Sequence, residues 1–246
     1  ERITEMVDAT EITIIFNLNP DGSEYDHSSG TILSWRKNRQ PTPGSSEIGT
    51  DINRNFDYQW GTNPLNASPS AWTYRGPSAW STPEASAFKR YVDGRVIGGQ
   101  QQIRVHVTFH QYGRIVLYPY GYTKDPVPDA DDHATLAAMA QQMGTLSRYA
   151  HAQSSYDEIH VGNQMDWLYA TYGILTFTFE MGDAFAMPDE AIATETARNM
   201  EAAYYAIEQA ALQAEPADNR EPILLPDTAM AIDPAQRSLS GPLVYR

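Results

Sequence analysis

Two stretches decide the fold: residues 103–110 read IRVHVTFH, and residues 174–180 read ILTFTFE. Both are rich in β-branched and aromatic residues, which is typical of strands packed inside a protein. One ends in His110 and the other in Glu180. Ligands of open α/β sheets bind outside the carboxyl ends of strands, so we expect both side chains to face one crevice. Taken singly, a buried hydrogen-bonded histidine and a salt-bridged glutamate are the commoner explanation, and only the other motifs reverse this preference.

The surrounding sequence alternates between strand and helix patterns. Residues 11–18 (EITIIFNL) predict a buried strand leading into a sharp turn at residues 19–22, and residues 114–118 predict another strand. Helix patterns and caps occur at residues 81–94, 132–150, 163–172 and 189–212. This alternation predicts an α/β protein.

Length and composition predict one main domain. The chain has 246 residues, of which 41% are hydrophobic, enough for one sizeable core. The domain is expected to cover residues 1–213. Residues 214–246 shift to proline and polar residues without a periodic face, which predicts a linker or the start of a C-terminal extension.

Charge and residue usage restrict the partners. The formal net charge is −14, which disfavours a nucleic acid or an anionic membrane as partner. The sequence contains no run of about 18 apolar residues, the length that a membrane-spanning helix needs. There is no cysteine, so a metal would have to be bound by histidine and carboxylates.

A long irregular region at residues 23–80 is where we expect a site, because loops of this length in compact domains are usually functional. Its segment GTDINRNF (49–56) places Arg54 between two amides, Asn53 and Asn55. An arginine fork with a neutral amide suits a planar anion such as a carboxylate. The cationic segment WRKNR (35–39) is explained as well by a solvated face.

Six blocks of the sequence occur in the order and approximate spacing of the zinc carboxypeptidases of the A, B and T type, which the chain resembles. They are NPDG (19–22), WRKNR (35–39), GTDINRNF (49–56), YRGPSAWSTPEA (74–85), FHQYGRIVLYPYGY (109–122) and GNQMDWLY with GILTFTFEM (162–181). Six ordered blocks are far more specific than one short motif. The resemblance implies a mixed, mostly parallel twisted sheet sandwiched between helices, with the N-terminal elements of that fold missing here.

The resemblance also implies roles for matching residues. His110 corresponds to the third zinc ligand and Glu180 to the general acid/base. Arg36 corresponds to the side chain that polarises the scissile carbonyl. Asn53 and Arg54 correspond to the clamp on the substrate's terminal carboxylate, which lets only the last peptide bond reach the metal.

Two tyrosines are candidates for substrate contacts. Tyr112 matches a tyrosine that lines the site in the family. The family's mobile tyrosine has Glu158 at its position here, and Tyr156 lies two residues earlier. We therefore expect Tyr156 to take that role only if the loop is shifted.

The pocket for the departing side chain is expected around Met165, together with Leu117 and Gly121. Its matching stretch, residues 163–165, reads NQM and lacks the acidic residue of family members that prefer Lys or Arg. A cation would be costly there, so we expect neutral, apolar or aromatic C-terminal residues.

The zinc site departs from the family's pattern. The family uses an H-x-x-E pair before the NPDG block, and none of the six histidines here has Glu three positions on. We expect this pair, and with it two of the three ligands of one Zn²⁺ ion, upstream of Glu1. The 246 residues alone are then expected to be inactive, because a single imidazole cannot build the site.

The resemblance predicts a secreted, monomeric metallocarboxypeptidase that hydrolyses the C-terminal peptide bond of peptides and proteins. The alternative is a non-catalytic domain that keeps the clamp and binds peptide C-termini. A serine or cysteine hydrolase has little support, because there is no cysteine and no nucleophile-elbow motif.

Overall fold

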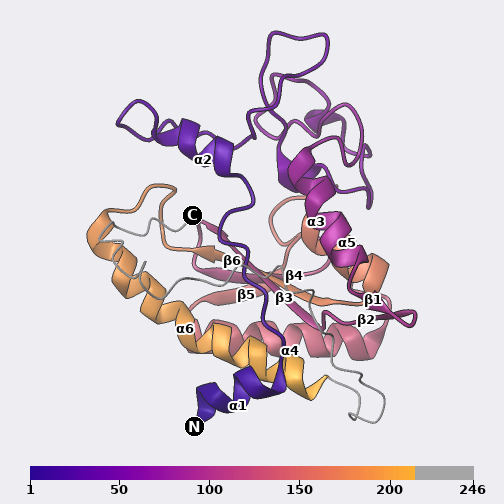
Figure 1. Cartoon of the computed structure of the whole chain (residues 1–246), viewed down its shortest axis with the longest axis vertical. Helices are drawn as coiled ribbons and strands as arrows, with labels where there is room; N and C mark the ends of the chain where they lie inside the picture. The colour runs from indigo at the N-terminus through magenta and orange to yellow at the C-terminus, as the bar shows by residue number, and fades with distance from the viewer. Residues whose placement is uncertain (214–246) are drawn as a thin grey trace, which may run out of the picture.

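The fold is built on a mixed sheet. The computed structural model describes residues 1–213. Its main sheet has four strands in the order β3-β6-β4-β5 (Figure 1). They are β3 (Val105–Gln111), β6 (Leu175–Met181), β4 (Ile115–Tyr118) and β5 (Ala150–Gln153). The pairs β3–β6 and β4–β5 are parallel and β4–β6 is antiparallel, which confirms the mixed, mostly parallel α/β sheet.

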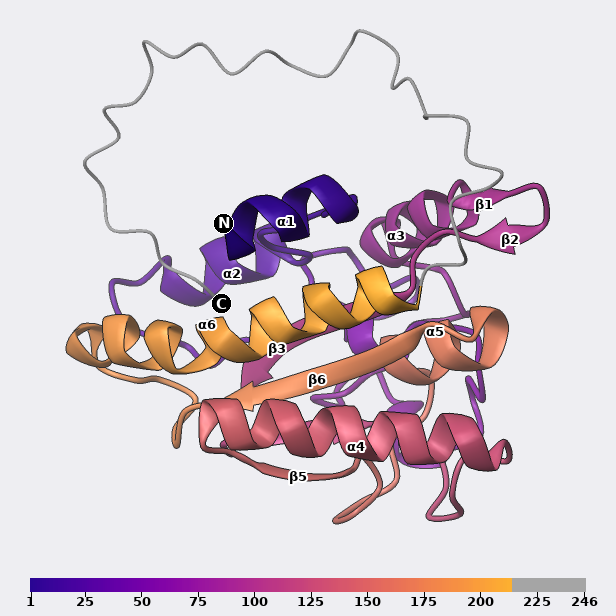
Figure 2. The same cartoon turned by 90° about the horizontal axis from the view of Figure 1, so that it is seen from below.

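Helices cover both faces of this sheet. One core cluster joins the sheet to α4 (Ala130–Ser147) and α6 (Asp189–Leu212), which run beside the strands in Figure 2. A second cluster joins α3 (Pro83–Asp93) and α5 (Gln164–Tyr172) to Ile174, the residue directly before β6. The remaining elements are α1 (Arg2–Ala9), α2 (Pro20–His27), the short 3-10 turns η1 (Ile52–Arg54) and η2 (Pro64–Asn66), and the hairpin of β1 (Val96–Ile97) and β2 (Gln100–Gln101).

The helix ends follow their local signals. Thr82 caps α3 by accepting a hydrogen bond from the Ala85 amide at 3.2 Å. Asn163 caps α5 in the same way through the Asp166 amide at 2.7 Å, and α5 ends at Gly173, whose φ of 66° is left-handed. The bounds of α6 agree with the prediction. Helix α4 ends at Ser147, and the last residue predicted for it, Ala150, begins β5.

The predicted buried strand at residues 11–18 is wrong. These residues connect α1 to α2 without strand pairing, and the side chains of Ile14 and Phe16 are 67% and 77% exposed. A β-strand needs a neighbour to satisfy its backbone groups, and within residues 1–213 no strand pairs with this segment. The predicted sharp turn at residues 19–22 opens α2 instead, with Asn19 as its cap.

Two expectations concern the last residues of the chain and the lack of a membrane-spanning segment. The predicted linker or extension at residues 214–246 lies outside the described residues. Among the helices described, none is long and apolar enough to cross a membrane.

Candidate active site

His110 and Glu180 are neighbours at the ends of two parallel strands. They are register partners in the β3–β6 pair, which places their Cα atoms side by side. Side chains at one register position point to the same face of a sheet. Both side chains therefore lie on one face of the sheet, near the ends of their strands.

His110 is held in its neutral form. Burial, and to a smaller extent the positive charge of Arg36, lowers the pKa of the His110 imidazole to about 4. A neutral imidazole is the form that binds a metal ion. However, residues 1–213 contain no group of three or more His, Cys, Asp or Glu side chains that could hold one. A catalytic zinc needs three protein ligands, so the described residues do not by themselves fit the ion.

The carboxyl of Glu180 has a raised pKa. Burial raises the pKa of its carboxyl to about 7, while the positive charge of Arg36 opposes the rise. A general acid/base works best when its pKa lies near the working pH. Glu180 can therefore both accept and release a proton near neutrality.

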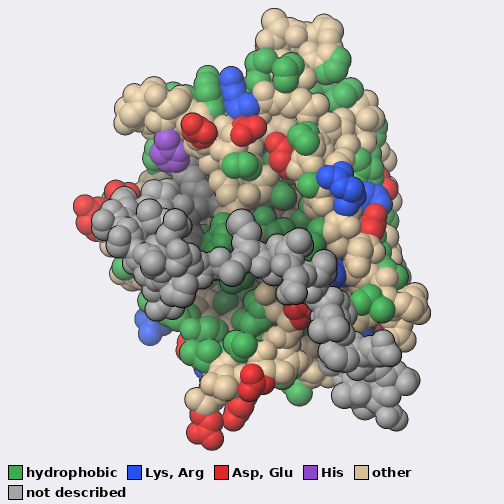
Figure 3. Space-filling model, in the orientation of Figure 1, with side chains coloured by type: hydrophobic (Ala, Val, Ile, Leu, Met, Phe, Trp, Pro, Cys, Tyr) green, Lys and Arg blue, Asp and Glu red, His purple; other side chains and the backbone are tan. Residues whose placement is uncertain are grey.

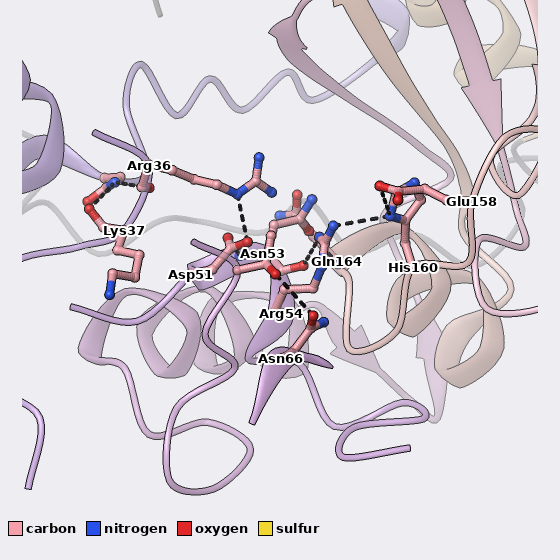
Figure 4. Close-up of polar contacts among 11 residues, drawn as sticks. Arg36, Lys37, Asp51, Asn53, Arg54, Asn66, Glu158, His160 and Gln164 are labelled. Atoms are coloured by element: carbon pink, nitrogen blue, oxygen red, sulfur yellow. Dashed lines mark hydrogen bonds and ion pairs between the residues drawn. The ribbon is translucent and has the colours of Figure 1, made fainter. Parts of the chain in front are cut away.

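Asp51 links Arg36 to the turn that carries Asn53. One oxygen of the Asp51 carboxylate accepts a hydrogen bond from Arg36 Nε at 2.7 Å, and the other accepts one from the Asn53 amide at 3.0 Å (Figure 4). The Asn53 side-chain oxygen in turn accepts the backbone N–H of Gln164 at 2.9 Å, at the start of α5. Three segments far apart in the sequence are thereby fixed to one another.

Arg54 is buried and held from two sides. Arg54 is only 7% exposed. Its guanidinium donates a hydrogen bond to the Asn53 carbonyl at 2.7 Å and contacts His160 Nδ1 at 3.1 Å. Burial and the charge of Arg54 lower the pKa of His160, so its neutral Nδ1 accepts the arginine's hydrogen. The Glu158 carboxylate lies 3.6 Å from the same nitrogen.

Asn55 is the structural centre of this loop. Its amide nitrogen donates to the carbonyls of Arg75 and Ser78, each at 2.8 Å, and to the Ser81 hydroxyl at 2.9 Å. Its oxygen accepts the Thr82 amide at 2.9 Å. Both polar atoms of the buried Asn55 side chain are hydrogen-bonded, and these bonds fix the position of the adjacent residues Asn53 and Arg54.

The expected pocket residues are apolar or open. Met165 and Leu117 are buried, and the Met165 sulfur contacts the Thr178 hydroxyl at 3.8 Å. Gly121 lies close to this point: a Cβ added there would meet the Asn163 side chain at 3.2 Å. The missing side chain at Gly121 thus keeps space beside the start of α5.

The two candidate tyrosines are at the surface. Tyr112 is 46% exposed and packs edge-on against Phe185. Tyr156 is 54% exposed, and its pKa is raised by burial and by the charges of Asp157 and Glu180.

Two residues of this network escaped the sequence analysis. Asp51 stands in the GTDINRNF block and could have been noticed as a carboxylate next to the clamp. His160 gave no signal, because its partner Arg54 lies 106 positions away.

Comparisons with known proteins identify the family of this chain. The sequence model for zinc carboxypeptidases matches residues 1–202. A zinc carboxypeptidase of Saccharothrix mutabilis subsp. capreolus is 40% identical over 205 residues, covering 80% of this chain and 47% of the relative. Human carboxypeptidase A1 is 32% identical over 185 residues, covering 73% of this chain and 42% of that protein. The chain therefore spans about half the length of the curated relatives it matches.

Solved structures share the fold. The crystal structure of thrombin activatable fibrinolysis inhibitor superposes with a TM-score of 0.77 and 23% identity, covering 87% of this chain and 54% of that one. Carboxypeptidase A from Helicoverpa armigera gives a TM-score of 0.68 and 25% identity, covering 85% and 55%. From the sequence match over residues 1–202 and these similarities, we conclude that the chain belongs to the zinc carboxypeptidase family.

Proposed function

We propose that this chain forms the substrate-binding part of a metallocarboxypeptidase that hydrolyses the C-terminal peptide bond of peptides and proteins. One observation carries the proposal: His110 and Glu180 are register partners at the ends of parallel strands, and the charges of Arg36 and Arg54 act on both. A base, a metal-binding imidazole and two anion-binding arginines thus share one crevice.

The roles follow from the chemistry of each group. Asn53 and Arg54 bind the terminal carboxylate of the peptide, because a guanidinium and an amide offer donors matched to its two oxygens. Glu180 takes a proton from the attacking water and returns one to the leaving amine, as its pKa of about 7 allows. Arg36 stabilises negative charge as it develops on the scissile carbonyl oxygen.

Zinc is the cofactor that family membership implies. His110 can supply one ligand, and we infer that the two others come from residues outside the described part of the chain, upstream of Glu1. When bound, the ion would polarise the carbonyl and acidify water.

We further propose that the departing residue is neutral and apolar or aromatic. The buried side chains of Met165 and Leu117 support this preference, because neither compensates the charge of a C-terminal Lys or Arg. Tyr112 and Tyr156 are proposed as substrate contacts at the rim. By resemblance alone, we infer a monomeric enzyme that acts outside the cell.

The test uses the protein that carries this domain together with its preceding segment. Zinc-dependent release of phenylalanine from a short peptide is measured for the wild type, Glu180→Gln and the control Glu5→Gln, a change at an exposed residue of α1. We expect Glu180→Gln to reduce kcat by about 10²–10⁴-fold, the usual contribution of a general acid/base. Full activity after chelation of zinc would show that the metal mechanism is wrong.

The second candidate function is a non-catalytic domain that binds peptide C-termini. It is favoured by the contrast between a clamp whose residues are hydrogen-bonded to neighbouring segments and the absence, within residues 1–213, of a complete set of metal ligands. A protein of this kind binds peptides with a free carboxylate and not their amides. It releases no amino acid even with zinc added.

A further inference from the structure

The guanidinium of Arg54 carries a buried charge without a carboxylate partner among the described residues. Arg54 is only 7% exposed, and none of the ion pairs within residues 1–213 includes it, whereas Arg36 is paired with Asp51 at 2.7 Å. Burial is the strongest influence on the pKa of the Arg54 guanidinium and lowers it. A buried charge is costly unless an opposite charge or hydrogen bonds compensate it. The positive charge of Arg54 is therefore available to an anionic ligand.

Two neutral acceptors orient this guanidinium. Arg54 Nη1 donates to the Asn53 carbonyl at 2.7 Å, and Nη2 contacts His160 Nδ1 at 3.1 Å (Figure 4). Arginine has no acceptor, so the imidazole receives this hydrogen bond on an unprotonated Nδ1. One anchor on each terminal nitrogen fixes the plane of the guanidinium, whereas a single anchor would let it turn about that bond. The contact with His160 therefore sets the direction in which the remaining N–H groups of Arg54 point.

His160 is held independently of Arg54. Its backbone N–H donates to the Gly121 carbonyl at 2.8 Å, and its own carbonyl accepts the side-chain amide of Asn163 at 3.1 Å. Gly121 belongs to the loop after β4, and Asn163 is the cap of α5. The side chain of His160 is 22% exposed. The imidazole is thus a fixed support against which Arg54 rests.

The charged groups around the imidazole leave it neutral. Asp157 Oδ1 lies 4.0 Å from Nε2, the nitrogen that carries the ring proton when Nδ1 is an acceptor. Glu158 Oε1 lies 3.6 Å from Nδ1, but its side chain is 74% exposed, so solvent screens its charge. Burial, followed by the charge of Arg54, lowers the pKa of His160. A neutral acceptor orients Arg54 without neutralising its charge, as a carboxylate in the same place would do.

The clamp borders a groove that is open to a peptide. Asn53 lines this groove together with the candidate metal ligand His110, and its volume is about 1720 Å³. Apolar side chains of the segment 11–18 form another part of its lining, and Figure 3 shows hydrophobic side chains gathered in a hollow at the centre of this face. In Figure 4 the Arg54 guanidinium lies between Asn53 and His160. His160 would therefore act on a ligand in the groove through Arg54.

We propose that His160 is a positioning residue of the carboxylate clamp, whose Nδ1 holds the Arg54 guanidinium in the orientation that receives the terminal carboxylate of a peptide. This inference rests on the proposed function, because it acts through Arg54. The two anchors leave one hydrogen on Nη1, one on Nη2 and one on Nε for the carboxylate oxygens. His160 thereby favours peptides with a free C-terminal carboxylate over their amides.

The test compares a short acetylated peptide that ends in phenylalanine with its C-terminal amide. Calorimetry measures both dissociation constants on the protein that carries this domain together with its preceding segment, in a Glu180→Gln background that keeps the peptide intact. The decisive quantity is the Kd of the amide divided by the Kd of the free acid. His160→Leu should lower this ratio at least about fivefold, through the loss of one hydrogen bond to a charged group. A general loosening of the loop would weaken both peptides alike and leave the ratio unchanged.

Three further variants define the cause. His160→Asn should keep the ratio within about twofold of the wild type, because the side-chain oxygen of asparagine can take the place of Nδ1. His160→Ala removes the ring without adding a branched side chain, and should act like His160→Leu. His151→Leu, the same change at an exposed histidine of β5, is the matched control and should leave the ratio unchanged. Circular dichroism and urea midpoints verify that each variant is folded.

Two results would overturn the inference while leaving the clamp in place. One is an unchanged ratio in the folded His160→Leu and His160→Ala variants. The other is a loss in His160→Asn as large as that in His160→Leu, which would assign the effect to the packing of the ring and not to Nδ1. A wild type that binds the free acid no better than the amide would contradict the proposed clamp itself, and the inference with it.

Discussion

The two sides of the candidate site are built to different degrees. On the clamp side, Asn53, Arg54 and Asn55 are tied by hydrogen bonds to two other segments of the chain, residues 75–82 and 160–164. On the metal side, His110 lies on a strand whose outer edge is unpaired within residues 1–213 and faces an apolar groove. The residues proposed for the clamp thus find their hydrogen-bond partners within residues 1–213, whereas the proposed metal ligand His110 borders a sheet edge that is unpaired there.

The largest effect on the contrast between the clamp side and the metal side is expected from a substitution of Asn55. Asn55→Ala removes four buried hydrogen bonds and should lower the free energy of unfolding by about 3–4 kcal/mol. Urea unfolding measures this change. Asn63→Ala, which removes a single capping bond from a more exposed turn, should cost about 1 kcal/mol. If both substitutions lowered the free energy of unfolding equally, the loop around Asn55 would be no more firmly held than the exposed turn at Asn63.

Arg54→Lys tests the clamp without removing its charge. Lysine cannot offer the planar fork, so a peptide with a free C-terminal carboxylate should bind about 30-fold more weakly, or ~2 kcal/mol. Calorimetry on the free and amidated peptides measures the difference. The control Arg39→Lys, on the cation that stacks over Tyr25, should leave the affinity unchanged. Unchanged carboxylate binding by Arg54→Lys would remove Arg54 from the clamp.

His160 should make the stability of the folded chain depend on pH. Its pKa is lowered in the folded chain from the usual 6.5, first by burial and then by Arg54. As pH falls below about 6.5, the unfolded chain takes up a proton that the folded chain does not, so stability falls with pH.

Comparing the wild type with His160→Gln isolates this contribution, which we expect to be about 1 kcal/mol or less between pH 7 and 5.5. Urea midpoints across this range measure it. His151→Gln, a change at an exposed site, serves as the control. An identical pH profile for wild type and His160→Gln would contradict the Arg54–His160 contact.

The smallest effect is expected on the groove side. Phe16→Ser should change the free energy of unfolding of the 246-residue chain by no more than about 0.5 kcal/mol, because the side chain is 77% exposed. Phe177→Ala, in the fully buried core, should cost about 3–5 kcal/mol. A large loss for Phe16→Ser would mean that the groove is already filled in solution.

Local signals predicted helices α3 to α6 and strands β3, β4 and β6, but not α1, α2 or the hairpin of β1 and β2. Strands β3 and β6 follow from runs of β-branched and aromatic residues, and α5 from its Asn cap and terminal glycine. Strand β5 was not predicted, because its four residues, AHAQ, carry no strand pattern and follow directly on a helix. In the other direction, EITIIFNL at residues 11–18 has the composition of a buried strand, but composition does not supply the neighbour that pairing requires.

The sequence by itself determined the α/β class, the family and the residue types of the site, because these depend on local patterns and on the order of motifs. Only the tertiary structure decided that Asp51 holds Arg36, that His160 contacts Arg54, and that one edge of β3 is unpaired among residues 1–213. The physical reason is sequence distance. Such contacts join groups up to 106 positions apart, and their geometry and pKa shifts exist only once burial brings those groups together.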